Sequence, residues 1–142
     1  MTPHIAFLHT SPVHVDTFER LVRASGQAIK IEHIVAEELL ADAQRLGPDY
    51  PSVVAQVQSA MNSAASTGAA IVVCTCSTIG GVAEKTPTTG QFIAARIDRA
   101  MADPAVVLGP RILLVAALES TLKPTVDLIE ESAFALQAEV KI

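Results

Sequence analysis

The feature that most constrains the fold is an alternation of short apolar runs with segments of helical periodicity. The clearest run, Ala69–Val73, is rich in Ile and Val and is followed by Ser and Thr residues that favour the start of a helix. Strands separated by helices are typical of a parallel sheet with helices on both faces. We therefore expect an α/β fold, with further strands over residues 5–9, 28–35, 92–97 and 112–116 and a sixth beginning at 140.

Apolar residues at helical spacing predict the connecting helices over 13–24, 37–46, 51 to about 67, and 121–138. The segment Arg99–Leu108 is also helical in pattern, but Pro104 leaves two alternatives open. Either Asp103 caps a short helix that has Pro104 at its first position, or the helix kinks there. The run Asp16–Glu19 resembles a capping box. If it starts the first helix, Thr10–Val15 forms a loop over the carboxyl end of the sheet.

Composition narrows the class of protein. The 142 residues are normally one domain, and half of them are apolar, so the chain can bury a core. The net charge of −5 and the lack of a basic cluster argue against nucleic-acid binding. No apolar run approaches the roughly 20 residues of a membrane span, and we see no signal peptide. The two cysteines are one residue apart, a poor spacing for a disulfide, so we expect reduced thiols and a cytoplasmic location.

Cys76 is the principal candidate for chemistry. It follows a predicted buried strand and precedes a predicted helix that begins with Ser77 and Thr78. Free backbone N–H groups and the helix dipole favour negative charge at such a position, and they favour the thiolate form of a cysteine. Cys76 is therefore a candidate base or nucleophile. The alternative is a small buried side chain, which is our interpretation of Cys74.

Three predicted strand ends carry hydroxyl groups at the start of a helix. They are the ends of the first, third and fifth strands, with the residues Thr10, Ser11, Ser77, Thr78, Ser120 and Thr121. Ligands of such sheets bind outside the carboxyl ends of the strands. If the three ends converge, they form a pocket for a small carboxylate that is held by hydroxyl and backbone N–H groups rather than by Arg. The same hydroxyls could simply cap their helices.

His9 lies at the end of the first strand and could carry a proton or orient the thiolate. A histidine bonded to the backbone is the alternative. Cys74 and Cys76 with His9 and His14 could also be interpreted as a metal site, but zinc sites place more residues between paired cysteines, so we expect no metal. No glycine-rich phosphate loop is present, and we expect no cofactor.

Three stretches resemble the aspartate/glutamate racemase superfamily. Val73–Gly80 resembles its first active-site turn, Arg96–Asp98 resembles the segment that joins its two lobes, and Ile112–Val126 resembles the opening strand, turn and helix of the second lobe. The resemblance implies a Rossmann-like α/β lobe over residues 1–97. It also implies the opening part of a second lobe over residues 98–142, packed on the first lobe or on a partner chain.

The resemblance implies a cofactor-independent isomerase or racemase that acts on a small carboxylate. Cys76 matches the cysteine that abstracts or delivers the α-proton, with Ser77 and Thr78 next to it. Thr121 matches the carboxylate-binding threonine of the second lobe. Such enzymes commonly use one cysteine from each lobe.

The chain departs from this pattern in two places. Ala117 stands where many relatives have Thr, and the position of a second catalytic cysteine is absent. Three explanations stay open: lost or altered activity, one-base chemistry such as decarboxylation, or two chains that complete each other's cleft. We expect a homo-oligomer. The alternative function is a non-catalytic carboxylate-binding or dimeric interaction module.

Overall fold

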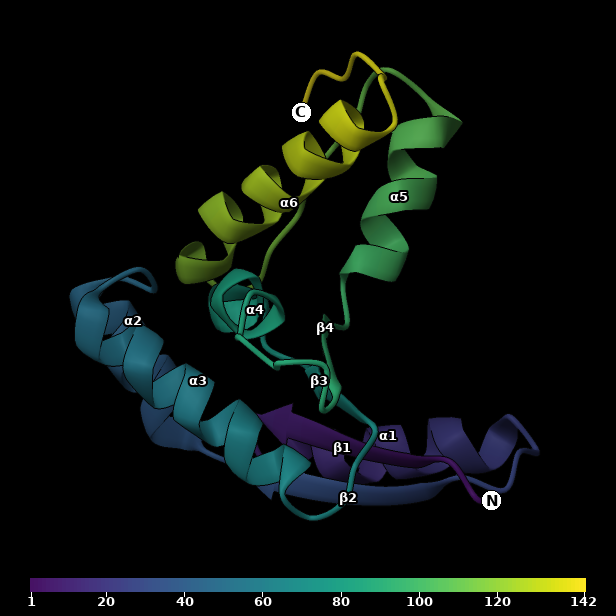
Figure 1. Cartoon of the computed structure of the whole chain (residues 1–142). Helices are drawn as coiled ribbons and strands as arrows, with labels where there is room; N and C mark the ends of the chain where they lie inside the picture. Colours follow the sequence, from purple (N-terminus) through teal and green to yellow (C-terminus); the bar gives the residue numbers. More distant parts are fainter.

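A four-stranded, wholly parallel sheet forms the centre of the computed structural model, which describes all 142 residues. The strand order is β2-β1-β3-β4, so the chain crosses over helices between strands (Figure 1). The strands are β1 (His4–His9), β2 (Lys30–Val35), β3 (Ile71–Cys74) and β4 (Ile93–Arg96). The predicted α/β fold with a parallel sheet is confirmed.

Helices cover the two faces of the sheet unequally. Because successive strand residues point to opposite faces, Ala6 and Leu8 face one layer while Phe7 and His9 face the other. The first layer holds most of the core and consists of α2 (Glu37–Leu46), α3 (Pro51–Ala65) and α4 (Ser77–Glu84). The second layer is α1 (Val13–Ala24) alone, which has no buried residue. No helix of the protein is long and apolar enough to cross a membrane.

The last third of the chain packs as a smaller unit on α4. It contains α5 (Arg99–Leu108), a 3-10 turn η1 (Glu119–Thr121) and α6 (Leu122–Ala135). A second apolar cluster lies between α5 and α6, separate from the core against the sheet, and α6 also contacts α4. Figure 1 shows the two helices standing away from the sheet, with α4 between them and the strands.

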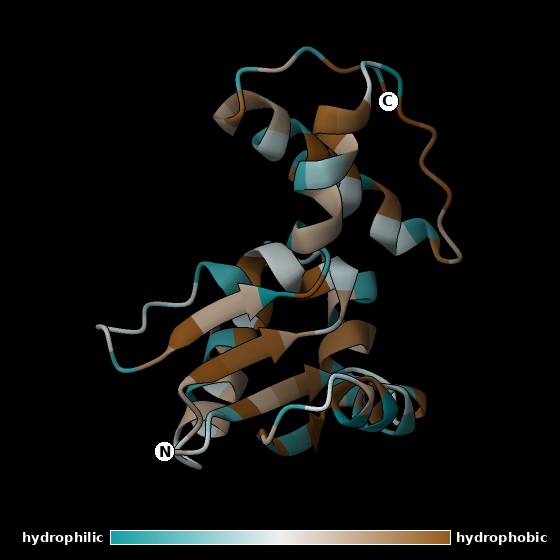
Figure 2. Cartoon of the chain, turned by 90° about the vertical axis from the view of Figure 1, so that its right-hand side faces the viewer, coloured by the Kyte–Doolittle hydropathy of each residue, from teal (hydrophilic) through white to brown (hydrophobic).

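The predicted strand over 112–116 is wrong. Backbone pairing there is limited to one isolated bridge, between Arg111 and Lys141. The predicted sixth strand, beginning at 140, consists of this bridge alone. The segment is extended, and Leu113 and Val115 are 90% and 84% exposed. Figure 2 shows this apolar segment running outside the helices, away from the sheet. Its alternating pattern suits a strand, but no neighbouring strand lies beside it.

The first helix has the predicted bounds, Val13–Ala24, and the alternative start at a capping box is wrong. The carbonyl groups of Ser11 and Pro12 already accept the N–H groups of His14 and Val15, so Asp16 lies within the first turn and no loop over 10–15 covers the sheet edge. Pro104 lies inside a single α5, so the alternative of a separate short helix capped by Asp103 is wrong.

Candidate functional site

Cys76 is the N-cap residue of α4 and connects it to the carboxyl end of β3. Its backbone is extended (φ −102°, ψ 116°), and the helix begins at Ser77. The side chain is half-buried and packs against the core cluster of the layer formed by α2, α3 and α4, called the α3 layer below. Cys76 thus has the predicted place before the first turn of α4, where backbone N–H groups are free, although its side chain makes no capping hydrogen bond to them.

Cys74 lies deeper and belongs to the core. Its side chain is buried, and its Sγ is 3.7 Å from the backbone oxygen of Cys76. Burial raises the pKa of the Cys74 thiol to about 12, because the thiolate would lose its hydration. Cys74 is therefore a packing residue and a poor proton donor or acceptor near neutral pH.

Two of the predicted hydroxyl groups meet directly. The Oγ1 of Thr78, in the first turn of α4, lies 3.3 Å from the Oγ of Ser120 in η1. Thr78 is 2% exposed, so this contact joins the last third of the chain to α4 in a largely dehydrated place. Thr121 does not join them, because its hydroxyl donates to the carbonyl of Leu118 in its own turn.

The remaining hydroxyl residues lie at the same edge of the sheet without a direct contact to this pair. Thr10 and Ser11 follow β1, which is the neighbour of β3, and Thr10 is buried. Ser77 is the first residue of α4 and is half-buried. Two of the three predicted strand ends, those of β1 and β3, lie side by side, but the third does not exist because no strand forms over 112–116. Ser120 reaches Thr78 from η1 instead, and these two hydroxyl groups are the only ones of the six in contact.

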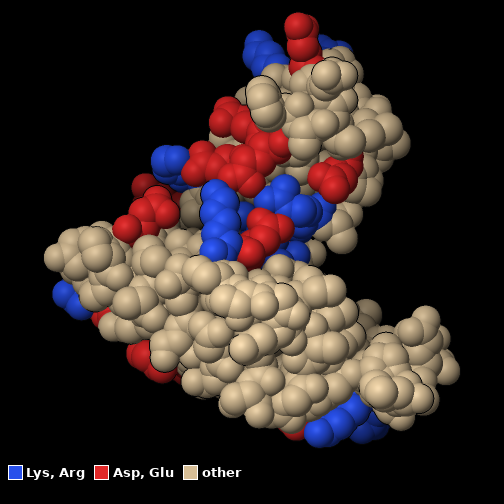
Figure 3. Space-filling model, in the orientation of Figure 1, with Lys and Arg blue, Asp and Glu red and all other residues tan.

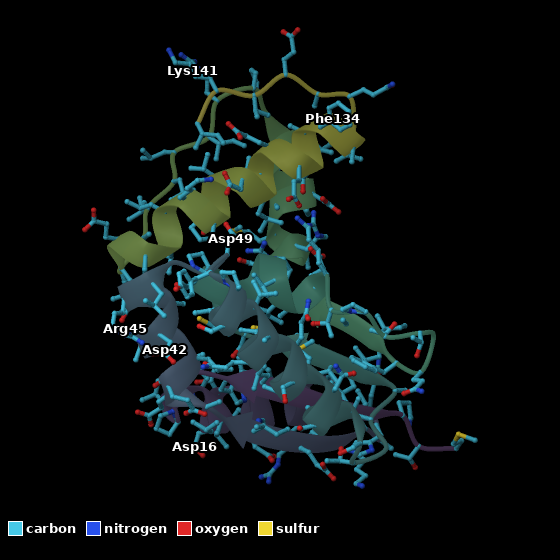
Figure 4. All side chains as sticks on the ribbon, turned by 60° about the vertical axis from the view of Figure 1, so that its left-hand side comes forward. Asp16, Asp42, Arg45, Asp49, Phe134 and Lys141 are labelled. Carbon is cyan, nitrogen blue, oxygen red and sulfur yellow. The ribbon has the colours of Figure 1, made fainter.

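Two adjoining hollows of about 250 and 120 Å³ open beside Thr78. They lie between the loop after α2 and the start of α6, and Figure 4 shows Asp49 of that loop beside α6. The two hollows share part of their lining, and Ser120 lines only the larger hollow. Cys76 lines neither hollow. The residues common to both are Pro48, Asp49, Thr78, Pro124 and Asp127.

The basic side chains around the hollows are already paired with carboxylates. Arg96 makes two hydrogen bonds to Asp98, of 2.6 and 2.9 Å, while the amino groups of Lys85 and Lys123 lie 3.4 and 2.6 Å from carboxylate oxygens on α6. Figure 3 shows these charges gathered at the waist between the sheet and the upper helices. Each of these basic side chains therefore has a carboxylate partner within the protein, and carboxylates such as Asp49 and Asp127 also line the hollows.

His9 is bonded to Thr75, the neighbour of Cys76, and not to Cys76 itself. The ring is fully buried, with Nδ1 2.7 Å from the Oγ1 of Thr75 and Nε2 2.8 Å from Nδ1 of His33. Burial and the neighbouring His33 and His14 lower the pKa of His9 to about 4. Its hydrogen bonds lead to the α1 face of the sheet and none of them reaches Cys76.

Sequence reasoning found His9 but missed its partners. His33 stands beside Phe7 in the β1–β2 register, on the face that also carries His9. The alternation of side chains along a strand places His33 on the same face as residues 31 and 35, and this much can be read from the sequence. The register between the two strands, which decides that His33 meets His9, is not encoded locally.

No family model, no curated protein and no solved structure matches this chain.

Proposed function

We propose that this protein is a cofactor-independent isomerase that exchanges the α-proton of a small carboxylate through the thiolate of Cys76. One observation carries the proposal: a half-buried free thiol at the N-cap of α4, one turn from the paired hydroxyls of Thr78 and Ser120. The resemblance of residues 73–80 to the active-site turn of the aspartate/glutamate racemase superfamily supports the same chemistry. A reducing compartment such as the cytoplasm would keep this thiol free.

The proposed step needs only the thiol, the substrate and water. The Cys76 thiolate takes the proton from the carbon next to the carboxylate, and the electron pair of the broken C–H bond moves into the carboxylate as an enediolate. N–H groups of the first turn of α4 and the Thr78 hydroxyl stabilise the added negative charge. The proton then returns from the Cys76 thiol to the same face, or water gives a proton to the opposite face and the hydroxide that remains takes the proton from the Cys76 thiol, which restores the thiolate.

Cys74 does not serve as the second acid in this scheme. Its burial and its raised pKa of about 12 oppose ionisation, and it ends β3 only two residues before Cys76 rather than lying across a cleft from it. The proposal is therefore one-base exchange within one chain, with inversion only where water supplies the second proton. A second chain that brings its own donor to the site would permit two-base racemisation, and this is the form in which we propose a homo-oligomer.

Exchange of substrate protons in D₂O tests the proposal. Proton NMR follows the loss of the α-proton signal from a panel of two- to six-carbon carboxylates, including hydroxy and amino acids. We expect exchange with the wild type and with Cys74→Ser, and at least 100-fold slower exchange with Cys76→Ser. Equal rates for the wild type and Cys76→Ser would refute a role for this thiol. Sedimentation velocity at micromolar concentration, run alongside, tests the oligomer.

A second candidate function is carboxylate binding without catalysis. The observation that favours it is that Thr78 and Ser120 line the larger hollow whereas Cys76 lines neither. Two-dimensional NMR titration with the same panel distinguishes the two functions. Shifts of the Thr78 and Ser120 amides, with no α-proton exchange and with slow alkylation of Cys76 by iodoacetamide at pH 7, would favour the binding module.

A further inference from the structure

Helix α1 contacts the sheet through one group of rings. The Phe18 ring lies 4.9 Å from that of Phe7 and 5.5 Å from that of His9, between ring centroids, and the His14 ring lies 6.1 Å from His9. His33 of β2 stacks on His9 at 5.1 Å. Helix α1 has no buried residue of its own, and its half-buried rings of His14 and Phe18 meet the fully buried His9 in this ring cluster.

The hydrogen bonds of His9 can be made by the neutral ring and by the charged ring, so the burial of a positive charge is what opposes protonation. The contact of 2.8 Å between Nε2 of His9 and Nδ1 of His33 joins two imidazole nitrogens and holds one proton. With His9 neutral, every ring nitrogen of His9 has a partner, because Nδ1 is bonded to the Thr75 hydroxyl. A protonated His9 would keep both of its N–H groups, so His33 would have to accept at Nδ1, and a positive charge would lie in a buried ring cluster.

We propose that this ring cluster is a pH-sensitive latch, which holds α1 on the sheet while His9 is neutral and releases α1 when His9 is protonated. Three elements contribute groups to it, so its opening separates α1 from β1 and β2 without disturbing the α3 layer. The proposal does not depend on the function proposed for Cys76, which packs against the opposite layer.

The charges around the cluster favour this direction. His14 comes from α1 and His33 from β2, and either of them, when charged, repels a proton on His9. The carboxylate of Glu19 of α1 lies 3.5 Å from Nε2 of His33 and 3.5 Å from Arg23, so it faces His33 rather than His9. Thr75 of β3 is uncharged.

The difference in the pKa of His9 between the latched and released states sets how strongly pH changes the equilibrium constant for release of α1. Release of α1 removes His14 and part of the burial from His9, while His33 of β2 stays beside it, so the ordinary pKa of 6.5 is the upper limit for the released state, against about 4 in the latched state. The released state therefore binds the proton first, and lowering the pH from 7 to 4.5 raises the equilibrium constant for release by at most about 60-fold. Below pH 4 both states are protonated and the effect levels off.

Hydrogen–deuterium exchange with mass spectrometry on the full chain tests the latch. Exchange rates are measured at pH 7 and pH 4.5 and corrected for intrinsic exchange. We expect the protection of peptides from α1 to be lower at pH 4.5 than at pH 7, by up to about 60-fold. Peptides from α3 should keep theirs. Equal losses in α1 and α3, or unchanged protection of α1, would overturn the proposal.

Three variants locate the effect in His9. His9→Gln retains hydrogen-bonding capacity but removes the titration, so the loss of α1 protection between the two pH values should disappear. His33→Gln removes the partner of His9 Nε2 and should reduce the loss, which gives a second route if His9→Gln does not fold. His4→Gln is the matched control on the same strand, since His4 faces Glu32 instead of the cluster, and it should behave as the wild type. A loss of α1 protection that persists in both His9→Gln and His33→Gln would also overturn the proposal.

Discussion

Gly80 offers a sharp test of how α4 is held on the sheet. In an exposed helix the change Gly→Ala stabilises by about 1 kcal/mol, because Ala loses less backbone freedom on folding. Gly80 is buried against Arg96, and a Cβ there would lie 3.0 Å from Nε and 3.2 Å from Cζ of that side chain. Such contacts are tighter than ordinary van der Waals separations, so the guanidinium group must move by a few tenths of an ångström.

Arg96 has little freedom to make that movement. Its side chain is 3% exposed, and its two hydrogen bonds to Asp98 fix the plane of the guanidinium group. Weakening one charge-assisted hydrogen bond costs about 1.5–3 kcal/mol, which exceeds the gain of about 1 kcal/mol from helix propensity. We therefore expect Gly80→Ala to lower the free energy of unfolding by about 1–2 kcal/mol.

Gly81 is the matched control in the same helix. Its added Cβ would lie 3.4 Å from Nη1 of Arg96, an ordinary contact, so Gly81→Ala should stabilise by about 0.5–1 kcal/mol. Urea denaturation followed by circular dichroism measures both. In a background of Arg96→Ala the two alanines should have similar, favourable effects, since Nε and the rest of the guanidinium group are gone. If Gly80→Ala and Gly81→Ala shift stability in the same direction in the native background, the reasoning fails.

Three further perturbations test other parts of the structure. Folding lowers the pKa of His9 to about 4, so the unfolded chain takes up the proton first as the pH falls. The contribution of His9 to the free energy of unfolding should be fully present above pH 6.5 and fall by about 3 kcal/mol as the pH drops to 4. Urea denaturation at a series of pH values measures this. Leu128→Ala, in the fully buried cluster between α5 and α6, should cost about 2–5 kcal/mol, whereas Phe134→Ala on the same helix, 89% exposed, should change stability by less than about 0.5 kcal/mol in the same urea titration. Arg99 bridges carboxylates of α4 and α6, so Arg99→Gln should cost about 1 kcal/mol in urea at low ionic strength and less in 0.5 M NaCl; a cost independent of salt would contradict an electrostatic role.

The sequence predicts the sheet and most helices of this protein because those signals are local. The helix Glu37–Leu46 has the expected bounds, and each of the four paired strands lies within one or two residues of its prediction. Periodicity of apolar residues over five to fifteen positions is enough for this. The predicted strand over 112–116 shows the limit of such reasoning. Its alternation is typical of a strand, but a strand requires a neighbour, and pairing between distant segments is not written in the segment itself.

The candidate site could be predicted in part for the same reason. That Cys76 precedes a helix follows from the residues next to it, and the N-cap position is found. The contact between Thr78 and Ser120 could only be expected as a convergence, since 42 positions separate them.

The period of two along the strands divides the polar chemistry of this chain between two faces. On β1, Leu8 packs in the α3 layer while the next residue, His9, enters the ring cluster beneath α1. On β3 the same alternation buries Cys74 in the α3 layer and directs Thr75 to His9. Cys76 then packs against the α3 layer again, so a substitution in the ring cluster and one at the cysteine turn have no shared partner. Their effects on stability should therefore add, and a measured coupling above about 0.5 kcal/mol in the double variant of His9→Gln and Cys76→Ser would show that the two faces communicate through the strand ends.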